Sequence, residues 1–405
     1  MKIGFSRTTI NPFLPCHLEG YQDRIANKIH DDLYLNTLCI KGKQTILIHI
    51  LDVVIIEKEL YEYLSNSIYE KYNCMFDQIF ISAIHTHSGP KVSHKIDKNI
   101  SLDEKYIKFL KRKILENTEE AVKNLIECKV FLGKNKINDV YSNRNHIYKY
   151  FQNEAMLISF KRIDLTPIVD VVNLACHPTV LNGTNLEVSS DYVGYLRKHY
   201  EDKTHIPLVF ANSECGDIST RLMRKGTDFK ECERVGTIIS NKIQDIYDLK
   251  EIDMEDLEIH KCNFYHTYKP SKNEFIQKML YQLKNPKKYF IDSDIRYKLK
   301  NRFIQSLENK LQFETIELNP TAYIITSKDL NIVTFPGELV SNLGFVLRNA
   351  SSKELFILSY TNDYYGYAVD ESQYGLYFET FESDYPYGIV DKFIEKISEE
   401  LKKIE

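Results

Sequence analysis

The chain has 405 residues, of which 43% are hydrophobic and 27% are charged, a composition typical of a folded protein with one large domain or two ordinary ones. The formal net charge of −4 gives no electrostatic basis for a nucleic-acid partner, so we expect none. The lysine-rich segments 108–113 and 284–288 have acidic residues nearby, and they indicate solvated helix faces.

Three features of the sequence indicate a cytoplasmic protein with no transmembrane segment. The longest apolar run, residues 46–56, contains His49 and Asp52 and is too short to cross a bilayer. Residues 1–7 lack the apolar core of a secretion signal. The cysteines form no CxxC pair and no tight cluster, which is typical of reduced, mostly buried thiols. They are Cys16, Cys39, Cys74, Cys128, Cys176, Cys215, Cys232 and Cys262.

The first part of the chain alternates predicted strands with predicted helices. Apolar, β-branched runs predict the strands, and amphipathic spacing predicts the helices. A capping-box pattern at Ser101 to Glu104 opens the second helix. The predicted strands are residues 3–11, 33–41, 45–56, 79–84, 130–140, 155–162, 168–175 and 207–211, and the predicted helices are about 58–72, 101–128 and 229–247.

The second part of the chain continues the alternation after a polar stretch. Residues 263–312 are rich in Lys, Asn and Gln but keep apolar residues at helical spacing, which predicts a helical insertion or lid. Strands are predicted at 321–326, 330–335 and 354–360, with a helix starting near Glu338 and an amphipathic helix at the end of the chain. We therefore expect a single α/β domain over residues 1–405, with a mixed β-sheet system flanked by helices and an active site in strand-end loops.

Two histidines leave the predicted strand 79–84 on the same face. Because successive side chains of a strand alternate between faces, His85 and His87 emerge together before Gly89-Pro90 turns the chain. Two imidazoles at the edge of a sheet can bind a metal ion and move a proton beside it. With 12 histidines in the chain, such a pair arises by chance in roughly one sequence in three, so other residues must support the prediction.

Five polar clusters each directly follow a predicted strand, where sites gather in α/β sheets. A catalytic zinc ion takes His nitrogen at about 2.0–2.1 Å and carboxylate oxygen at about 2.0–2.2 Å, and it keeps one position open. His85, His177 and Glu338 would supply two histidines and one carboxylate. The clusters are His85-Thr86-His87, His177-Pro178, Gly216 to Ser219, Pro336-Gly337-Glu338 and Asn362 to Tyr367.

Residues 85–90, read as His-Thr-His-Ser-Gly-Pro, resemble the signature of the neutral, non-lysosomal ceramidases. These are zinc amidases that release a fatty acid from an N-acylated sphingoid base. The resemblance continues in chain order through six further short segments, which are spread along nearly the whole chain. They are Asn143-Arg144, Ala175 to Thr179, Ser189 to Gly194, Asn212 to Ser219, Pro336 to Glu338 and Asn362 to Tyr367.

The resemblance implies a role for each matching residue. It implies a Zn²⁺ ion held by His85, His177, Glu338 and Tyr367, because an adjacent dication favours the ionised form of a tyrosine. It further implies that His87 transfers protons, that Arg144 faces the developing oxyanion, and that Ser219 is a candidate nucleophile. A substrate-positioning tyrosine falls at Tyr374 or Tyr377, where the match slips by about one residue.

The implied reaction is hydrolysis of an amide bond. An amide carbonyl is a poor electrophile, so a Lewis acid and a guanidinium are needed to polarise it. The attacking group is either a water activated by the metal or the Ser219 hydroxyl, and the sequence leaves both open. His87 would then protonate the leaving amine. Manganese or iron also suits these ligands, so zinc is the expected ion and not the only one.

Three functions remain open at this point. The first is a zinc-dependent amidase that cleaves a ceramide-like N-acyl amide, with an acyl amide or lipid as its small-molecule partner. The second hydrolyses a smaller soluble amide or ester at the same site, and the third is a non-catalytic lipid- or partner-binding relative. Thr220 stands where ceramidases usually carry proline, and the chain ends about where their catalytic domain ends, before their immunoglobulin-like domain. The sequence says nothing about the oligomeric state.

Overall fold

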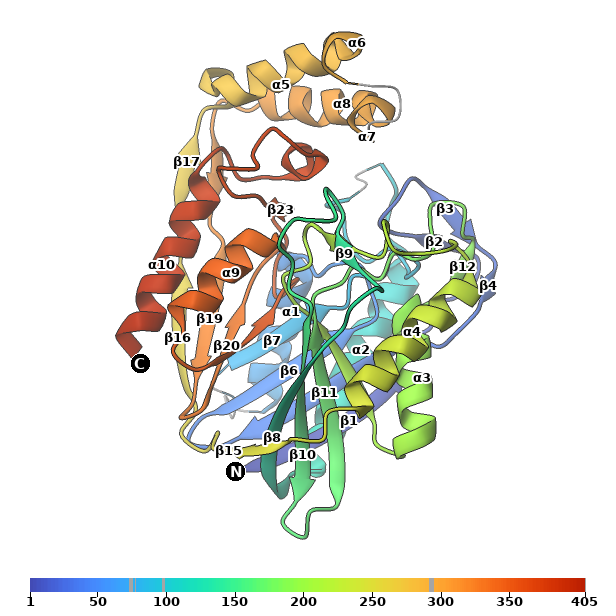
Figure 1. Cartoon of the computed structure of the whole chain (residues 1–405), viewed down its shortest axis with the longest axis vertical. Coiled ribbons are helices and arrows are strands. Elements are labelled where there is room, and N and C mark those ends of the chain that lie inside the picture. The colour runs from blue at the N-terminus through green and yellow to red at the C-terminus, as the bar shows by residue number, and fades with distance from the viewer. Residues whose placement is uncertain (73–75, 77, 97–98, 291–294, 405) are drawn as a thin grey trace.

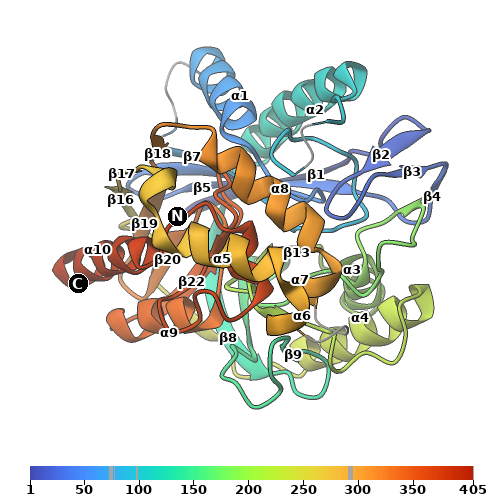
Figure 2. The same cartoon turned by 90° about the horizontal axis from the view of Figure 1, so that it is seen from above.

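The computed structural model describes residues 1–72, 76, 78–96, 99–290 and 295–404. Two β-sheets form the centre of the molecule, and helices cover their outer faces (Figures 1 and 2). Most sheet pairs are antiparallel and several are parallel, so the predicted mixed α/β fold is confirmed. Among the described residues, no helix is long and apolar enough to cross a membrane.

The larger sheet has nine strands in the order β13-β11-β10-β8-β1-β5-β6-β7, with β15 pairing beside β8. The pairs β6–β7 and β11–β13 are parallel, and the other pairs are antiparallel. The strands are β1 (Lys2–Thr9), β5 (Tyr34–Lys41), β6 (Thr45–Leu51), β7 (Gln78–Ala83), β8 (Ile126–Lys136), β10 (Glu154–Arg162), β11 (Pro167–Leu174), β13 (Leu208–Asn212) and β15 (Lys250–Ile252).

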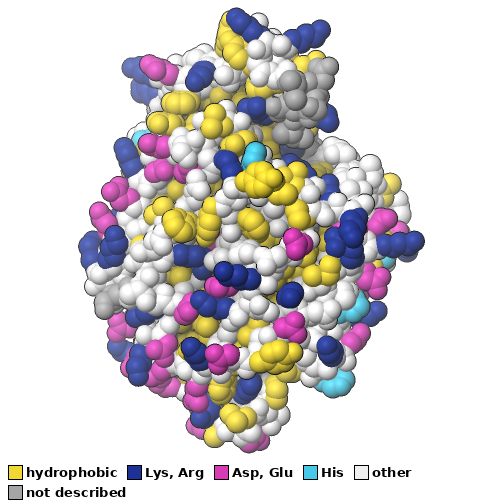
Figure 3. Space-filling view, viewed as in Figure 1, with side chains coloured by type: hydrophobic (Ala, Val, Ile, Leu, Met, Phe, Trp, Pro, Cys, Tyr) yellow, Lys and Arg dark blue, Asp and Glu magenta, His cyan; other side chains and the backbone are white. Residues whose placement is uncertain are grey.

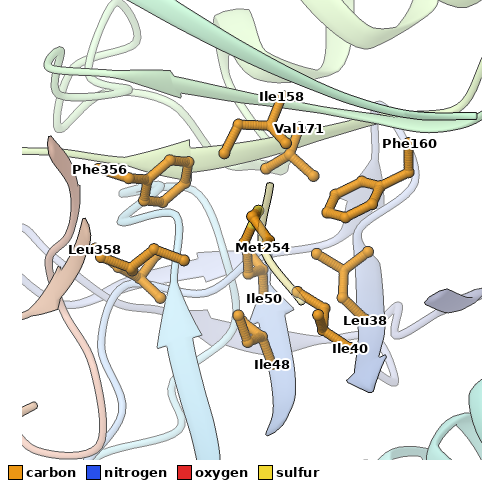
Figure 4. A pocket seen from close by; sticks show the side chains of 11 residues that line it. Leu38, Ile40, Ile48, Ile50, Ile158, Phe160, Val171, Met254, Phe356 and Leu358 are labelled. Carbon is orange, nitrogen blue, oxygen red and sulfur yellow. The ribbon is translucent and has the colours of Figure 1, made fainter. Parts of the chain in front are cut away.

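The smaller sheet has the order β16-β19-β20-β22, and its β20–β22 pair is parallel. Its strands are β16 (Glu258–Asn263), β19 (Thr321–Thr326), β20 (Leu330–Thr334) and β22 (Glu354–Leu358). Side chains of both sheets meet in one core, where Ile50, Ile158 and Phe356 line a cavity of about 30 Å³ (Figure 4). Since every lining side chain is apolar, this cavity belongs to the packing of the core and offers no polar group to a ligand.

Six long helices cover the two sheets from different sides (Figure 2). α2 packs on β1 and β5, α3 on β13, α4 on β8, and α9 and α10 on the smaller sheet. The amphipathic α10 buries Phe393, Ile397 and Leu401, as its apolar spacing predicts. These helices are α1 (Lys58–Lys71), α2 (Glu104–Lys123), α3 (Tyr192–Thr204), α4 (Phe229–Gln244), α9 (Ser341–Ala350) and α10 (Ile389–Ile404).

The stretch 263–312 carries a group of short helices above the sheets (Figure 1). The chain enters this group of helices through β17 (His266–Tyr268) and leaves it through β18 (Ile316–Leu318), and these two strands pair antiparallel. The group has its own apolar cluster, in which Phe303 stacks on Phe381 at 5.1 Å between ring centroids. Its members are η1 (Pro270–Lys272), α5 (Glu274–Lys284), α6 (Pro286–Tyr289), α7 (Ile295–Lys298) and α8 (Lys300–Leu311). That these helices form a lid, and that the chain is one domain, stay predictions.

Several element boundaries differ from the predicted ones by a few residues, and the helix α3 is not among the predicted elements. Two of these differences have a clear physical cause. The N-cap of α2 is Asp103, whose carboxylate accepts from the backbone N–H groups of Lys105 and Tyr106, and Ser101 lies outside the helix. Glu338 does not start a helix, because it lies in β21 (Glu338–Leu339), which pairs in parallel with β23 (Tyr367–Ala368). The helix α9 begins three residues later, at Ser341.

Short strand pairs tie the loops together around the ends of the large sheet. The pair that matters most for the site joins the loop of Arg144 to the loop of Ser219, through β9 and β14. The pairs are β2 (Cys16–Leu18) with β3 (Arg24–Ala26), β4 (Lys28–Ile29) with β12 (Glu187–Val188), and β9 (Ser142–Asn143) with β14 (Ile218–Ser219).

His49 makes the fold sensitive to acid. It is fully buried in β6 beside Thr37 and Thr118, and burial lowers its pKa to about 3. In the unfolded chain His49 binds a proton as the pH falls below about 6.5, whereas in the folded chain it does so only near pH 3. The free energy of unfolding therefore falls as the pH falls through this range. We expect His49→Gln to reduce this loss of unfolding free energy by up to about 1.4 kcal/mol per pH unit. Urea unfolding of both proteins at pH 7 and at pH 5 measures the difference. Equal losses in both proteins would contradict the prediction.

Candidate metal centre

Three side chains from distant parts of the chain meet at one point in the interior. His85 follows β7, His177 follows β11, and Glu338 lies in β21. All three are buried, and one ligand atom of each lies within 4.8 Å of the others. Glu338 Oε2 is 2.9 Å from His177 Nε2 and 3.5 Å from His85 Nε2. The structure thus brings together the two histidines and the carboxylate that the sequence singles out.

Backbone carbonyl groups fix the orientation of both imidazoles. Nδ1 of His85 lies 2.8 Å from the carbonyl oxygen of Val54, and Nδ1 of His177 lies 2.7 Å from that of Cys215. A carbonyl oxygen only accepts, so each Nδ1 carries a hydrogen and donates it. In the neutral ring this arrangement leaves the lone pair on Nε2, which faces Glu338 in both histidines, and this is the form of histidine that binds a metal ion. The donor set fits a divalent cation.

The charge of the site is also suited to a dication. Burial lowers the pKa of His85 to about 4, so the ring is neutral at neutral pH. Burial alone would raise the pKa of Glu338, but His85, His177 and a hydrogen bond from Tyr364 together lower it to about 2. The ionised carboxylate of Glu338 beside the neutral ring of His85 places negative charge in a water-poor interior, which a bound cation would offset.

Tyr367 and Arg144 lie beside this group of ligands. Tyr367 is the direct partner of Glu338 in the β21–β23 pair, and its ring centroid is 6.4 Å from that of His177. Burial raises the pKa of Tyr367 well above its usual value, whereas Arg144 acts to lower it through its charge and a hydrogen bond, and a bound cation would favour the phenolate further. Arg144 donates from Nε to Glu379 at 2.9 Å, and its Nη1 lies 3.5 Å from His177 Nε2.

His87 lies at the edge of the three ligands. Its Nε2 is 3.2 Å from His85 Nε2, whereas its Nδ1 is buried and has no hydrogen-bond partner among the described residues. The backbone of Gly20 packs against the ring, and a Cβ there would approach the His87 Cγ to 2.5 Å. Tyr21 contacts the same ring edge-on at 4.6 Å between centroids. Burial and the two neighbouring histidines lower the pKa of His87, so the ring is a neutral base.

Ser219 lies next to His177 through its backbone. The two residues form an isolated parallel bridge, and the Ser219 Oγ accepts from the backbone N–H of Arg221 at 3.2 Å. Within the described part of the chain, no imidazole or carboxylate is hydrogen-bonded to this oxygen. Ser219 is therefore near the candidate ligands but has no base in contact with its hydroxyl.

The two tyrosines considered for substrate positioning contact residues other than Arg144. Tyr374 donates to the Tyr385 carbonyl at 3.0 Å and packs on Phe275 of α5, and Tyr377 lies under Lys149. Two aromatic rings flank Arg144, those of Phe378 and Tyr367, with centroids 4.6 Å and 5.3 Å from the guanidinium carbon. A role for Tyr374 stays a prediction, and the structure adds Phe378 to the site.

Three further residues of the site are missed by the sequence. Tyr364 donates from its hydroxyl to Glu338 Oε1, and Glu379 forms the buried ion pair with Arg144. Tyr360 stacks on His85 at 4.2 Å between ring centroids. Tyr364 belongs to the predicted cluster Asn362 to Tyr367 and was within reach of prediction. No sequence pattern marks Tyr360 or Glu379, because their contacts depend on distant loops.

The fold and the residues together define a mixed α/β protein with a buried candidate metal site. A model of the N-terminal domain of neutral/alkaline non-lysosomal ceramidases matches residues 3–263. The chain belongs to this family, and the sequence resemblance is thereby confirmed. It is similar to the crystal structure of the neutral ceramidase from Pseudomonas aeruginosa, with 16% identity and a TM-score of 0.79 over 100% of this chain and 74% of that one. A ceramidase complexed with C2 gives 15% identity and a TM-score of 0.77 over 100% and 75%.

The carboxylate of Glu338 should dominate metal affinity, because it is the one anion among the three ligands. We expect Glu338→Gln, which keeps the shape and removes the charge, to weaken binding of Zn²⁺ and Co²⁺ by at least about 100-fold in equilibrium dialysis. Glu395→Gln, at an exposed position of α10, is the matched control and should bind both ions as the wild type does. Unchanged affinity in the Glu338 variant would mean that the ion binds elsewhere.

Proposed function

We propose that the protein is a zinc-dependent amidase that cleaves a ceramide-like N-acyl amine. The observation that carries the proposal is the buried group of His85, His177 and Glu338, in which both Nε2 atoms face one carboxylate oxygen. Membership of the ceramidase family supports an amide as the substrate.

Zinc is the ion that the neighbouring donors favour. Two imidazoles and a carboxylate are a common protein ligand set of catalytic zinc, and Tyr367 adds an oxygen beside them. When bound there, Zn²⁺ would act as a Lewis acid that polarises the scissile carbonyl. All three ligands are held by groups around them, namely the carbonyls of Val54 and Cys215 and the hydroxyl of Tyr364.

Arg144 is suited to stabilise the charge that develops on the carbonyl oxygen. Its Nε is occupied by Glu379, but its Nη2 is buried and has no hydrogen-bond partner among the described residues. An unpaired buried donor costs free energy in the resting protein, and an oxyanion would satisfy it during the reaction. Glu379 holds the guanidinium in place, so little reorganisation is needed at that moment.

His87 is the proposed proton-transfer group. Its Nε2 faces the ligands and its Nδ1 faces the backbone of Gly20, so Nε2 is the atom in position to take a proton from an attacking water. The lowered pKa of His87 keeps the ring unprotonated before attack. The same ring then donates that proton to the leaving amine, which departs as a neutral product.

Water is the proposed attacking group, in preference to Ser219. A serine hydroxyl becomes a nucleophile through a base within hydrogen-bond reach, and among the described residues the Ser219 Oγ is hydrogen-bonded to the N–H of Arg221 and to no base. Ser219 instead supports the turn that presents Arg221. Hydrolysis would then proceed without a covalent intermediate.

Apolar side chains near the site support a hydrophobic acyl group. The loops that carry Arg144 and Phe378 expose Ile147, Tyr148 and Leu376, and Tyr148 is 88% exposed. Figure 3 shows hydrophobic side chains gathered below the helices α5 to α8, over the region of β9. An acyl chain would cover such side chains and gain the free energy of their removal from water.

We further propose that the protein works in the cytoplasm. The seven cysteines of the described residues are free, and all are buried, as thiols of a reducing compartment are. Cys74 lies outside the described residues. Cell fractionation with an antibody against the protein tests this location, and recovery in a secreted fraction would contradict it.

The zinc content of the protein and the dependence of its rate on acyl-chain length together test the proposed function. We expect one zinc ion per chain, a loss of hydrolysis on the order of 100-fold or more after chelation, and recovery with added Zn²⁺. Across N-acyl amides of rising acyl length, kcat/KM should rise about 2- to 4-fold per methylene until the chain is covered. A rate that falls with length would favour a smaller soluble amide, and a protein without zinc that hydrolyses no amide would favour the non-catalytic alternative.

The choice of water as attacking group has its own test. We expect no acyl-enzyme to accumulate when the reaction is quenched in the first turnovers and the intact protein is weighed by mass spectrometry. We also expect amine release to show no initial burst. An acyl adduct that disappears in Ser219→Ala would contradict the proposed route.

A further inference from the structure

Arg221 is an unpaired cation beside the candidate metal centre. It is exposed to solvent, and among the described residues its guanidinium makes no ion pair and no hydrogen bond. Its guanidinium carbon lies 5.7 Å from the ring centroid of Phe378, and the same centroid is 4.6 Å from the guanidinium carbon of Arg144. One small molecule can therefore reach both guanidinium groups.

Neighbouring protein groups act on the guanidinium of Arg221. Although the residue is exposed, the protein atoms around it lower the pKa of its guanidinium, and repulsion from Arg144 lowers it further. The group stays charged at neutral pH, because an arginine pKa starts above 12. A charge in such a position lacks part of its hydration and has no protein anion in contact with it.

Two more arginines surround the same place. Arg24 donates to the carbonyls of Glu19 and His87, and Arg224 donates to those of Thr179 and Val180. Carbonyl oxygens satisfy the donors but carry no formal charge, so the positive charges remain. Together with Arg221, they act on one ring, Tyr21, whose pKa burial raises and these three arginines lower.

The acidic groups nearby are already engaged. Glu379 is ion-paired with Arg144, and Glu338 belongs to the candidate ligands. Asp191 accepts from the backbone N–H groups of Val180, Leu181 and Tyr192. The approach to the site is therefore positive in a chain whose formal net charge is −4. This local excess of positive charge is suited to attract a negatively charged ligand.

We propose that Arg221 binds an oxyanion of the substrate, so that the preferred substrates are N-acyl amides with a carboxylate or phosphate a few bonds from the scissile carbonyl. A guanidinium forms paired hydrogen bonds with both kinds of group. The inference rests on the proposed function, because it concerns the substrate of the same site. It assigns Arg221 to substrate selection, whereas Arg144 faces the reacting carbonyl.

Matched substrates test this selection. N-lauroylglycine is compared with N-lauroylglycinamide, and N-lauroylphosphoethanolamine with N-lauroylethanolamine, each with the zinc-loaded protein. We expect the wild type to prefer the anionic member of at least one pair, and the pair identifies carboxylate or phosphate. In Arg221→Ala the ratio of kcat/KM, anionic to neutral, should fall about 10- to 100-fold, with partial recovery in Arg221→Lys.

The matched control is Arg162→Ala. Arg162 is equally exposed, lies at the β10–β11 turn at the opposite end of the sheet, and should leave both rates unchanged (Figure 1). Equal rates for both members of each pair in the wild type, or an unchanged ratio in Arg221→Ala, would overturn the inference.

Calorimetry separates this inference from the proposed function. Binding of N-lauroylglycine and of N-lauroylglycinamide is measured for the wild type and for Arg221→Ala. If the wild type hydrolyses neither amide but still binds the anion more tightly through Arg221, the proposed function fails and the oxyanion site stands. If hydrolysis occurs without any dependence on Arg221 in rate or affinity, the proposed function stands and the oxyanion site fails.

Discussion

The hydrogen bonds from two imidazole N–H groups to backbone carbonyls are the constraint on which the site depends. Val54 and Cys215 supply the carbonyls from the loops that follow β6 and β13, so the main chain of these loops decides which nitrogen of each ring carries the hydrogen. Without these bonds, either nitrogen of His85 or His177 could carry the hydrogen. With them, both lone pairs are directed to one carboxylate before any ion arrives.

Close contacts between loops hold the carboxylate where these lone pairs meet. The N–H of Gly216 donates to the Leu339 carbonyl at 2.8 Å, and a Cβ at Gly216 would approach the Glu338 carbonyl oxygen to 2.7 Å. Asp217 accepts from Asn143 and from the N–H of Ser341. The loop after β13 is thus bonded to β9 on one side and to the start of α9 on the other. A glycine is needed where the two main chains touch.

The sequence predicts the ligands better than it predicts their surroundings. His85, His177 and Glu338 each follow a strong strand signal, and sites gather beyond the ends of strands in α/β sheets. The strands β7 and β11 are not adjacent in the large sheet and β20 lies in the smaller one, so the convergence of the three residues depends on the packing of the two sheets. The ion pair of Arg144 with Glu379 joins segments more than 200 residues apart, and no local pattern marks it. Phe378 lies at Arg144 because the 3-10 helix η2 (Phe378–Glu382) turns there, which shifts the aromatic position away from Tyr374.

Helix boundaries were wrong where pairing between distant segments prevailed over local preference. Pro336 to Glu338 has the composition of a helix start, but the backbone of Glu338 pairs with Tyr367 and so enters a strand. This pairing has a chemical result, since it places the carboxylate and the phenol on adjacent chains. A strand of only two residues is too short to leave a periodic signal in the sequence.

The 3-10 helix η2 contacts both the inserted helices and Arg144. Phe381 is buried under Phe303 of the inserted helices, and Glu379, two residues earlier, holds the guanidinium of Arg144. Through Phe381, the inserted helices therefore support the turn that carries Glu379, and with it the position of Arg144. A shortened chain in which β17 ran directly into β18 would leave Phe381 in water and would remove the packing against which Glu379 is seated.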